Sequence, residues 1–271
     1  MELALFIRRE KDITLLEHPE TSTTYKTLDS TILEFIKNQG FDRIYFGSET
    51  CENCMPNINS VRRIEKTASE YNIGFTLVTP ICTDYGIDYL NTILPSINKK
   101  TIEVIPNDFG VLYMLSQMDF KGEIIMGRLL AKSKKWPIGD VPKEFKEPLC
   151  HSPFGLTEYQ KYLKEIGISA IEVDNRIEGY DTKLDVLPFK IEMHLPFVYL
   201  TSGRMCFFSG QEKSKKDKFG ITKGCKRYCD WQTVRLNEQF YSNGRAIYSI
   251  NNNIENLKKH RIDRVIISLN L

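Results

Sequence analysis

The chain has 271 residues, a formal net charge of +2 and a hydrophobic content of 41%. This length suits two small domains or one α/β barrel, and the hydrophobic content is enough for a full core. The nearly balanced charge excludes a composition devoted to nucleic acid or to membrane surfaces, so any basic binding site must be local.

Short apolar runs bounded by polar segments predict buried strands along the whole chain. The first seven lie at Leu3–Arg8, Arg43–Gly47, Gly74–Pro80, Thr101–Pro106, Glu123–Met126, Ser169–Val173 and Ile191–Thr201. Nearer the C-terminus, Ala246–Ser249 is expected as a strand or a sheet edge, and Arg264–Leu269 as the last strand.

Segments with helical spacing separate these runs, with Gly40 placed to end the first helix and Asn57 or Asn59 placed to cap the second. Helices are expected at Ser30–Gln39, from that cap to Tyr71, and at Asp88–Ile97, Phe109–Met118, Glu158–Ile166 (capped by Thr157) and Asn253–His260. Between Leu129 and Pro148, prolines and many lysines predict a long irregular connection.

Strands and helices that alternate in this way indicate a parallel β/α architecture. About eight strands favour a single irregular (β/α) TIM-like barrel spanning residues 1–271, over an open sheet followed by a separate cysteine-rich domain. No G-x-G-x-x-G follows the first strand, which removes the main support for a dinucleotide-binding fold. Functional residues of a barrel lie beyond the carboxyl ends of its strands, where we expect Cys51, Asn107-Asp108 and Cys206.

Seven cysteines occur in the chain, and Cys206, Cys225 and Cys229 fall within the short stretch Tyr199–Trp231. The N-terminal apolar run is too short for a signal sequence, and no run is long enough to span a membrane. We therefore expect a cytoplasmic protein with reduced thiols. Thiolates this close in sequence, in a basic context, favour a zinc or iron–sulfur site over isolated buried cysteines.

The stretch S-G-R-M-C-F-F-S, followed after a lysine-rich loop by G-C-K-R-Y-C-D-W, resembles the collagenase-like peptidase family U-32. The matching residues are Ser202, Gly203, Arg204, Cys206, Ser209, Gly224, Cys225, Cys229 and Trp231. Upstream, I-E-V-I-P-N-D-F-G-V-L at 102–112 is similar to a strand and helix start of that family, so the likeness covers most of the chain. Met205 is an extra residue between Arg204 and Cys206.

In the ubiquinone-biosynthesis branch of this family, a further ligand lies in a G-E-T-x-C context, which is similar to G-S-E-T-C at 47–51. By this resemblance, Cys51, Cys206, Cys225 and Cys229 hold a [4Fe–4S] cluster. The resemblance also implies oxygen-independent hydroxylation of a small aromatic or RNA-base substrate, with a small anion such as prephenate as oxygen source. The non-catalytic alternative is a cluster-bearing subunit that works with a homologous barrel protein. Protease activity is not supported, because no protease motif is present.

Other ligand sets stay open at the level of the residues. Cys54 forms C-x-x-C with Cys51, so Cys51, Cys54, Cys225 and Cys229 would make a closed zinc site, although that set leaves Cys206 unused. A radical-SAM pattern is disfavoured because its third cysteine position is occupied by glutamine. The isolated Cys82 and Cys150 are typical of packing or neutral thiols.

Arg204, Asn107 and Asp108 are the candidate catalytic residues. Arg204 can bind a carboxylate bidentately, whereas Asn107 and Asp108 either orient a substrate or cap the following helix. His194, in an apolar run, is typical of a core histidine. The lysine-rich loop Gln211–Lys223 is either a solvated surface loop or an electrostatic attractor for an anionic substrate or RNA.

Overall fold

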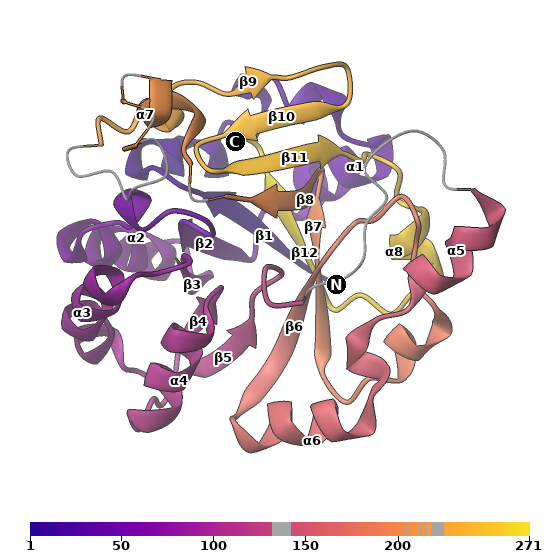
Figure 1. Cartoon of the computed structure of the whole chain (residues 1–271), viewed down its shortest axis with the longest axis horizontal. Coiled ribbons are helices and arrows are strands. Elements are labelled where there is room, and N and C mark those ends of the chain that lie inside the picture. Colours follow the sequence, from indigo (N-terminus) through magenta and orange to yellow (C-terminus); the bar gives the residue numbers. More distant parts are fainter. Residues whose placement is uncertain (132–141, 204, 212, 215, 218–224) are drawn as a thin grey trace.

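The computed structural model describes residues 1–131, 142–203, 205–211, 213–214, 216–217 and 225–271. Parallel strands close into an eight-stranded barrel in the order β1-β12-β7-β6-β5-β4-β3-β2 (Figure 1). The barrel strands are β1 (Glu2–Ile7), β2 (Arg43–Gly47), β3 (Gly74–Thr79), β4 (Ile102–Pro106), β5 (Glu123–Met126), β6 (Ile168–Asp174), β7 (Lys190–Leu195) and β12 (Arg264–Ser268). Because β1 pairs with both β2 and β12, the ring is complete, and the predicted α/β TIM-like barrel is confirmed.

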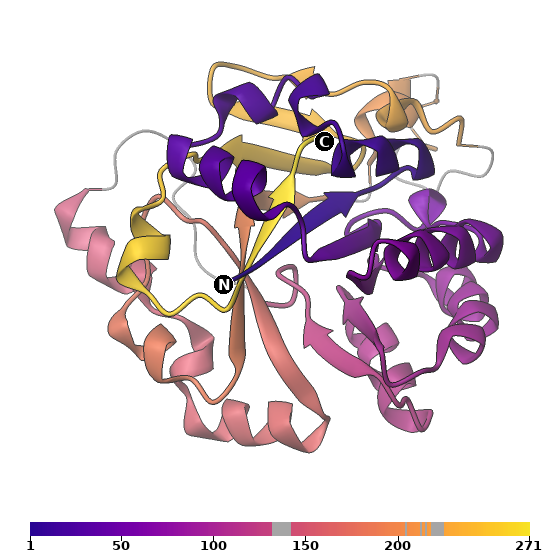
Figure 2. The same cartoon turned by 180° about the vertical axis from the view of Figure 1, so that it is seen from behind.

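Helices connect the strands and cover the outside of the barrel (Figures 1 and 2). They are α1 (Ser30–Gln39), α2 (Ile58–Glu70), α3 (Asp84–Ile93), α4 (Phe109–Gln117), α5 (Lys143–Cys150), α6 (Thr157–Glu165) and α8 (Glu255–Lys259). A further helix, α7 (Phe207–Gln211), lies beyond the carboxyl end of the barrel (Figure 1). Outward side chains such as Leu5 and Ile44 belong to the large core beneath these helices, whereas Ala4 and Ile105 belong to a smaller apolar cluster inside the barrel. Burial on both faces explains why the strand sequences are continuously apolar.

Predicted capping residues begin two of these helices. Asn57 accepts a hydrogen bond from the backbone N–H of Ser60 (2.9 Å) at the start of α2, and Asp108 accepts one from Gly110 (2.6 Å) at the start of α4. Gly40, with φ of +72°, ends α1 as predicted. These caps satisfy backbone donors that a helix cannot pair internally, so they fix where each helix starts.

A second sheet lies across the carboxyl end of the barrel (Figure 1), and we call it the lid sheet. Its antiparallel strands, in the order β8-β11-β10-β9, are β8 (Phe197–Ser202), β9 (Val234–Arg235), β10 (Phe240–Asn243) and β11 (Ala246–Ile250). The backbone N–H of Tyr199 in β8 donates to Asp174 at the end of β6 (2.8 Å). In β10, Asn243 accepts a hydrogen bond from Arg8, which follows β1.

The lid sheet corrects one prediction, because the run Ile191–Thr201 is two strands rather than one. Strand β7 ends at Leu195, and a cis peptide bond to Pro196 leads directly into β8. Proline lacks the N–H that would continue the parallel ladder, so the chain leaves the barrel here. Cys206 therefore follows a lid strand and not, as we expected, a barrel strand.

Three helices, α3, α5 and α6, also differ from the predicted elements. Helix α3 begins at Asp84 rather than Asp88, because the backbone N–H and hydroxyl of Thr83 both donate to Glu52 (2.8 Å each) and start the helix one turn earlier. Helix α5 occupies part of the predicted irregular connection, of which residues 132–141 lie outside the described residues. Thr157 is the first helical residue of α6 rather than its cap.

Candidate functional site

Three cysteines from two distant parts of the chain pack together at the carboxyl end of the barrel. Cys51 and Cys54 lie in the loop between β2 and α2, and Cys229 lies in a short 3-10 helix at Tyr228–Asp230. All three are buried and form one cluster, against which Phe208 packs. The sulfurs of Cys54 and Cys229 are 3.6 Å apart. The early and late cysteines therefore form one site, although 175 residues separate Cys54 from Cys229.

Two more cysteines belong to the same region. Cys206 is buried, and the N–H of its neighbour Phe207 donates to the carbonyl of Gly244 (3.0 Å), next to Cys229. Burial raises the pKa of Cys225, and the charges of Cys54 and Cys206 raise it further, so these sulfurs interact electrostatically. We call Cys51, Cys54, Cys206, Cys225 and Cys229 the cysteine site.

The cysteine site contains the four predicted ligands together with Cys54, which that predicted set does not include. Cys54 is the best connected of the five, because it contacts Cys51 and Cys229 and interacts with Cys225. The C-x-x-C spacing with Cys51 indicated Cys54, but only the zinc alternative includes this residue. Cys82 is only partly buried, and the Cys150 thiol donates to the carbonyl of Glu178 (2.9 Å).

The cysteine site concentrates negative charge on Cys54. Hydrogen bonds from Cys229 and Cys51 hold the pKa of Cys54 far below its usual range, while the same contacts and burial raise the pKa values of Cys51 and Cys229. In this pattern, a thiolate at Cys54 accepts hydrogen bonds from the thiols of Cys51 and Cys229. A metal that binds all three sulfurs must displace the remaining protons, so its affinity should rise with pH.

Arg8 supplies a positive charge to this site. Its Nη2 atom lies 3.8 Å from the Cys54 sulfur and 3.7 Å from the Cys229 sulfur, and its Nη1 atom donates to Asn243 of the lid sheet. Burial alone would lower the pKa of Arg8, but Cys54 and Cys229 raise it above its usual range. Sequence reasoning missed Arg8, since nothing in a strand-end arginine indicates a cysteine partner far along the chain.

A buried ion-pair network lies beneath the lid sheet. Arg128, beyond β5, donates two hydrogen bonds to Glu49 (2.6 and 2.7 Å), one to Asp174 (3.0 Å) and one to the carbonyl of Phe197 (2.7 Å). We call these four residues the Arg128 network. Glu49 lies two residues before Cys51, and Phe197 begins the strand that leads to Cys206. Arg128 therefore ties together the two segments that supply the cysteines.

His194 and Glu172 form a second buried pair inside the barrel, with His194 Nε2 and Glu172 Oε1 3.1 Å apart. Burial and the charge of Glu49 raise the pKa of Glu172 well above its usual range. With Glu49, the pair forms a group in which one potential ligand atom from each residue lies within 4.8 Å of the others. Arg128 already occupies both oxygens of Glu49, which opposes a metal there.

The candidate catalytic residues have structural contacts or lie outside the described residues. Asn107 is buried, donates to the carbonyl of Thr79 (3.1 Å) and accepts from the N–H of Leu129 (3.3 Å). Asp108 caps α4, the non-catalytic alternative considered for it. Arg204 and Gly224 lie outside the described residues, as do residues 212, 215 and 218–223 of the lysine-rich loop.

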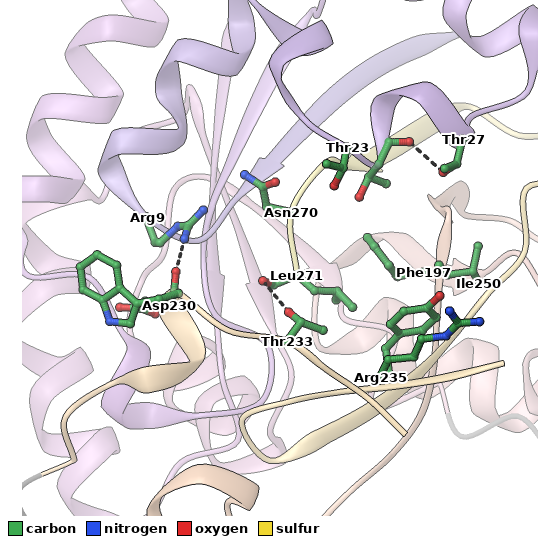
Figure 3. A pocket seen from close by; sticks show the side chains of 13 residues that line it. Arg9, Thr23, Thr27, Phe197, Asp230, Thr233, Arg235, Ile250, Asn270 and Leu271 are labelled. Atoms are coloured by element: carbon green, nitrogen blue, oxygen red, sulfur yellow. Dashed lines mark hydrogen bonds between the residues drawn. The ribbon is translucent and has the colours of Figure 1, made fainter. Parts of the chain in front are cut away.

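Two hollows flank the segment that follows Cys229. One, of about 400 Å³, lies between the end of β1, the loop before α2 and Lys226–Trp231. The other, of about 470 Å³, lies between the segment after β1 and the lid sheet, and Figure 3 shows Thr23, Thr27 and Arg235 around it. Arg9, whose guanidinium donates to the carbonyl of Asp230, lines both hollows. Asp230 and Trp231, which follow Cys229 in the chain, also line both hollows.

The fold and the site define a (β/α) barrel protein with a group of cysteines at the carboxyl rim of the barrel. No protein-family model, curated protein or solved structure matches the chain. No helix in the described part of the chain has both the length and the apolar character needed to cross a membrane.

Proposed function

We propose that this protein binds a [4Fe–4S] cluster at the carboxyl rim of its barrel. The observation that supports the proposal is the convergence of five cysteines from two distant segments, beside a buried arginine. Cysteine thiolates are the standard ligands of such clusters, and hydrogen bonds to the sulfurs tune them. When bound, the cluster supplies one-electron transfer.

The cluster needs four ligands, and the site offers five. We assign three ligands to Cys206, Cys225 and Cys229 and the fourth to the loop after β2. The U-32 resemblance implies Cys51, and Cys54, whose sulfur lies 3.6 Å from that of Cys229, is the alternative from the same loop. The unused cysteine of the pair would remain as a neighbouring thiol.

Anaerobic purification tests the cluster. We expect a brown protein with about four irons and four sulfides per chain and broad absorption near ~400 nm. Single replacement of Cys206, Cys225 or Cys229 by serine should remove or degrade the cluster. Of Cys51→Ser and Cys54→Ser, the damaging variant identifies the fourth ligand, while Cys150→Ser is the matched control that should stay brown. A colourless protein free of iron would contradict the proposal.

Zinc is the second candidate, and one distance favours it. Two thiolates bound at 2.3 Å to a tetrahedral ion lie about 3.8 Å apart, close to the 3.6 Å between the sulfurs of Cys54 and Cys229. Thiolates on different irons of a cluster lie farther apart. The same purification decides between the two, because the zinc site predicts one zinc per chain and no sulfide.

For activity, we propose oxygen-independent hydroxylation of a small aromatic or RNA-base substrate, as the U-32 resemblance implies. The hollow lined by Arg8 and Asp230 supports this proposal because it can hold a small molecule against Arg8, which contacts the sulfurs of Cys54 and Cys229. The alternative is a non-catalytic subunit that passes electrons to a homologous barrel protein, since four thiolates leave no open iron position.

An anaerobic deletion strain, profiled for modified RNA bases and quinone precursors, tests the activity. We expect one hydroxylated product to disappear and to return with the wild-type chain. Failure of Arg204→Ala to restore it, with the cluster retained, supports catalysis. Restoration by Arg204→Ala together with co-purification of a second barrel protein favours the subunit, and an unchanged profile contradicts both.

A further inference from the structure

The 400 Å³ hollow beside the cysteine site is strongly basic, and we call it the basic hollow. Its cationic side chains outnumber its acidic ones by five to two: Arg8, Arg9, Lys11, Lys226 and Arg227 against Glu10 and Asp230. The net charge of the whole chain is only +2, so this concentration is local. Cations around a concave surface focus their field into it and favour an anionic ligand.

The arginines of the basic hollow are held in place by partners. Arg9 makes a bidentate pair with Asp12 (2.6 Å for both contacts), and Nε of Arg227 lies 2.8 Å from Asp230. Lys11 and Lys226 are exposed at its rim, so their ammonium groups can turn toward a ligand without breaking a buried contact. The hollow therefore combines ion-paired arginines, fixed in position, with two exposed lysines that can reorient.

The basic hollow also contains an exposed aromatic side chain. Trp231 is 68% exposed there, and the Lys11 ammonium lies 4.7 Å from the centre of its ring. Phe46 and Pro56, which also line the hollow, are buried. An exposed tryptophan beside cations suits a ligand that stacks its own flat body while it presents a negative group to the lysines.

We propose that the basic hollow binds a small molecule that carries an oxyanion, either a carboxylate or a phosphate ester, on a flat apolar body. The volume lies within the range of small-ligand sites. Arg8 lines this hollow and also contacts the sulfurs of Cys54 and Cys229, so the bound molecule would lie next to the cysteine site. Only the view that the bound molecule is a substrate rests on the proposed function. Binding to the basic hollow does not depend on which metal the cysteine site holds.

Tryptophan fluorescence tests the proposal directly. The chain has two tryptophans, so a Trp136→Phe variant leaves Trp231 as the reporter. We expect its emission to change saturably with benzoate or phenyl phosphate, and neutral benzyl alcohol to bind at least tenfold more weakly. The tighter of the two anions identifies carboxylate or phosphate ester as the preferred group.

Lysine variants locate the binding site. In the same background, Lys11→Gln/Lys226→Gln should weaken anion binding about tenfold, whereas Lys161→Gln/Lys164→Gln on α6 should leave it unchanged. The absence of a saturable response to either anion, equal binding of benzyl alcohol, or equal effects of the two lysine pairs would overturn the proposal. Metal analysis of the same sample separates the two claims, since anion binding by a metal-free preparation supports the hollow and contradicts the cluster.

Discussion

Arg8 places a permanent positive charge beside two cysteine sulfurs and is held there from the opposite side. Arg8 follows β1 and contacts the sulfurs of Cys54 and Cys229. On its other side it donates a hydrogen bond to Asn243 of the lid sheet. An arginine in this position offsets thiolate charge that burial would otherwise make costly. Arg8 should therefore help to retain metal without being a ligand.

Replacing Arg8 by glutamine should weaken metal retention about 10- to 100-fold, the usual cost of removing a partner of a metal ligand. The measurement is the metal that remains after competition with a chelator. Arg8→Lys, which keeps the charge but not the planar donor group, should fall between glutamine and wild type. Arg63→Gln, at an arginine with a 58% exposed side chain, is the matched control. Equal retention by Arg8→Gln and wild type would contradict this role.

Asp108 can be tested for a structural or a catalytic role. Its carboxylate caps α4 by accepting from Gly110, and asparagine can make the same bond. We expect Asp108→Ala to lower the free energy of unfolding by about 1 kcal/mol and Asp108→Asn to be nearly neutral. Chemical denaturation measures both. An Asp108→Asn variant that folds normally but fails to restore the product in the deletion strain would instead indicate catalysis.

The residues of the cysteine site were partly predictable from the sequence. Short-range spacing drew attention to Cys225 and Cys229, and C-x-x-C linked Cys51 with Cys54. Which of these sulfurs touch depends on how the loop after β2 meets the 3-10 helix at Tyr228–Asp230, and no local pattern encodes that approach. Arg8 was missed for the same reason.

At the scale of elements, the cysteine site depends on two segments that meet only in the folded chain. The loop after β2 is fixed by Glu49, and β8 is fixed by the carbonyl of Phe197, both through Arg128. Arg128 and Glu49 have side-chain exposures of 2% and 3%, so their pairing is shielded from water and salt. The Arg128 network should act as a clamp that sets the spacing of the cysteines.

Glu49→Gln should lower both stability and metal retention. Removing one partner of a buried ion pair lowers the free energy of unfolding by about 3 kcal/mol. Here it also removes the contact with Arg128 that holds the loop carrying Cys51 and Cys54. Glu103→Gln is the matched control, because Glu103 pairs with Arg264 (2.8 and 3.0 Å) near the other end of the barrel. Thermal unfolding and chelator competition measure the two effects. Comparable metal loss in both variants would show that stability alone, and not the clamp, governs retention.

The barrel strands were predictable because each is a largely apolar run, whereas the lid sheet was predictable only in part, with Ala246–Ser249 expected as a strand or sheet edge and found in β11. Strand β9 has two residues, and β10 (Phe240–Asn243) is polar enough to escape a hydrophobic pattern. Strand β8 pairs with β11, about 50 residues later, through a register that shifts between Ile247 and Tyr248. Pairing of this kind depends on tertiary contacts and leaves no periodic signal in the sequence.

Across the whole molecule, the barrel interior has a central apolar cluster between two charged regions. The Arg128 network lies at the carboxyl end, beneath the lid sheet. Toward the amino end, Arg264 pairs with Glu2, Glu103 and Glu192. Glu103 and Glu192 both lie within apolar runs, but a hydrophobic pattern does not predict which partners such charged residues will have. In a barrel, the amino end contributes to stability and the carboxyl end to function.

Glu192 should make the stability of the whole barrel depend on pH. Burial raises the pKa of Glu192 to about 8, against the pull of Arg264 and with help from Glu103 and Glu172. A carboxyl whose pKa is higher in the folded state binds more protons there than in the unfolded chain. Its stabilising contribution is therefore complete below the unfolded value of 4.5 and is lost as pH rises toward 8.

Between about pH 5 and 8, this group should lower the free energy of unfolding by up to about 1.4 kcal/mol per pH unit. Glu192→Gln keeps an acceptor for Tyr45 and Arg264, which contact Glu192 at 2.5 and 2.6 Å, but cannot titrate. Urea unfolding at a series of pH values should therefore give a flatter profile for Glu192→Gln than for wild type, with the two curves diverging toward high pH. Parallel curves would mean that Glu192 titrates alike in the folded and unfolded states, and that the amino end of the barrel tolerates its charge.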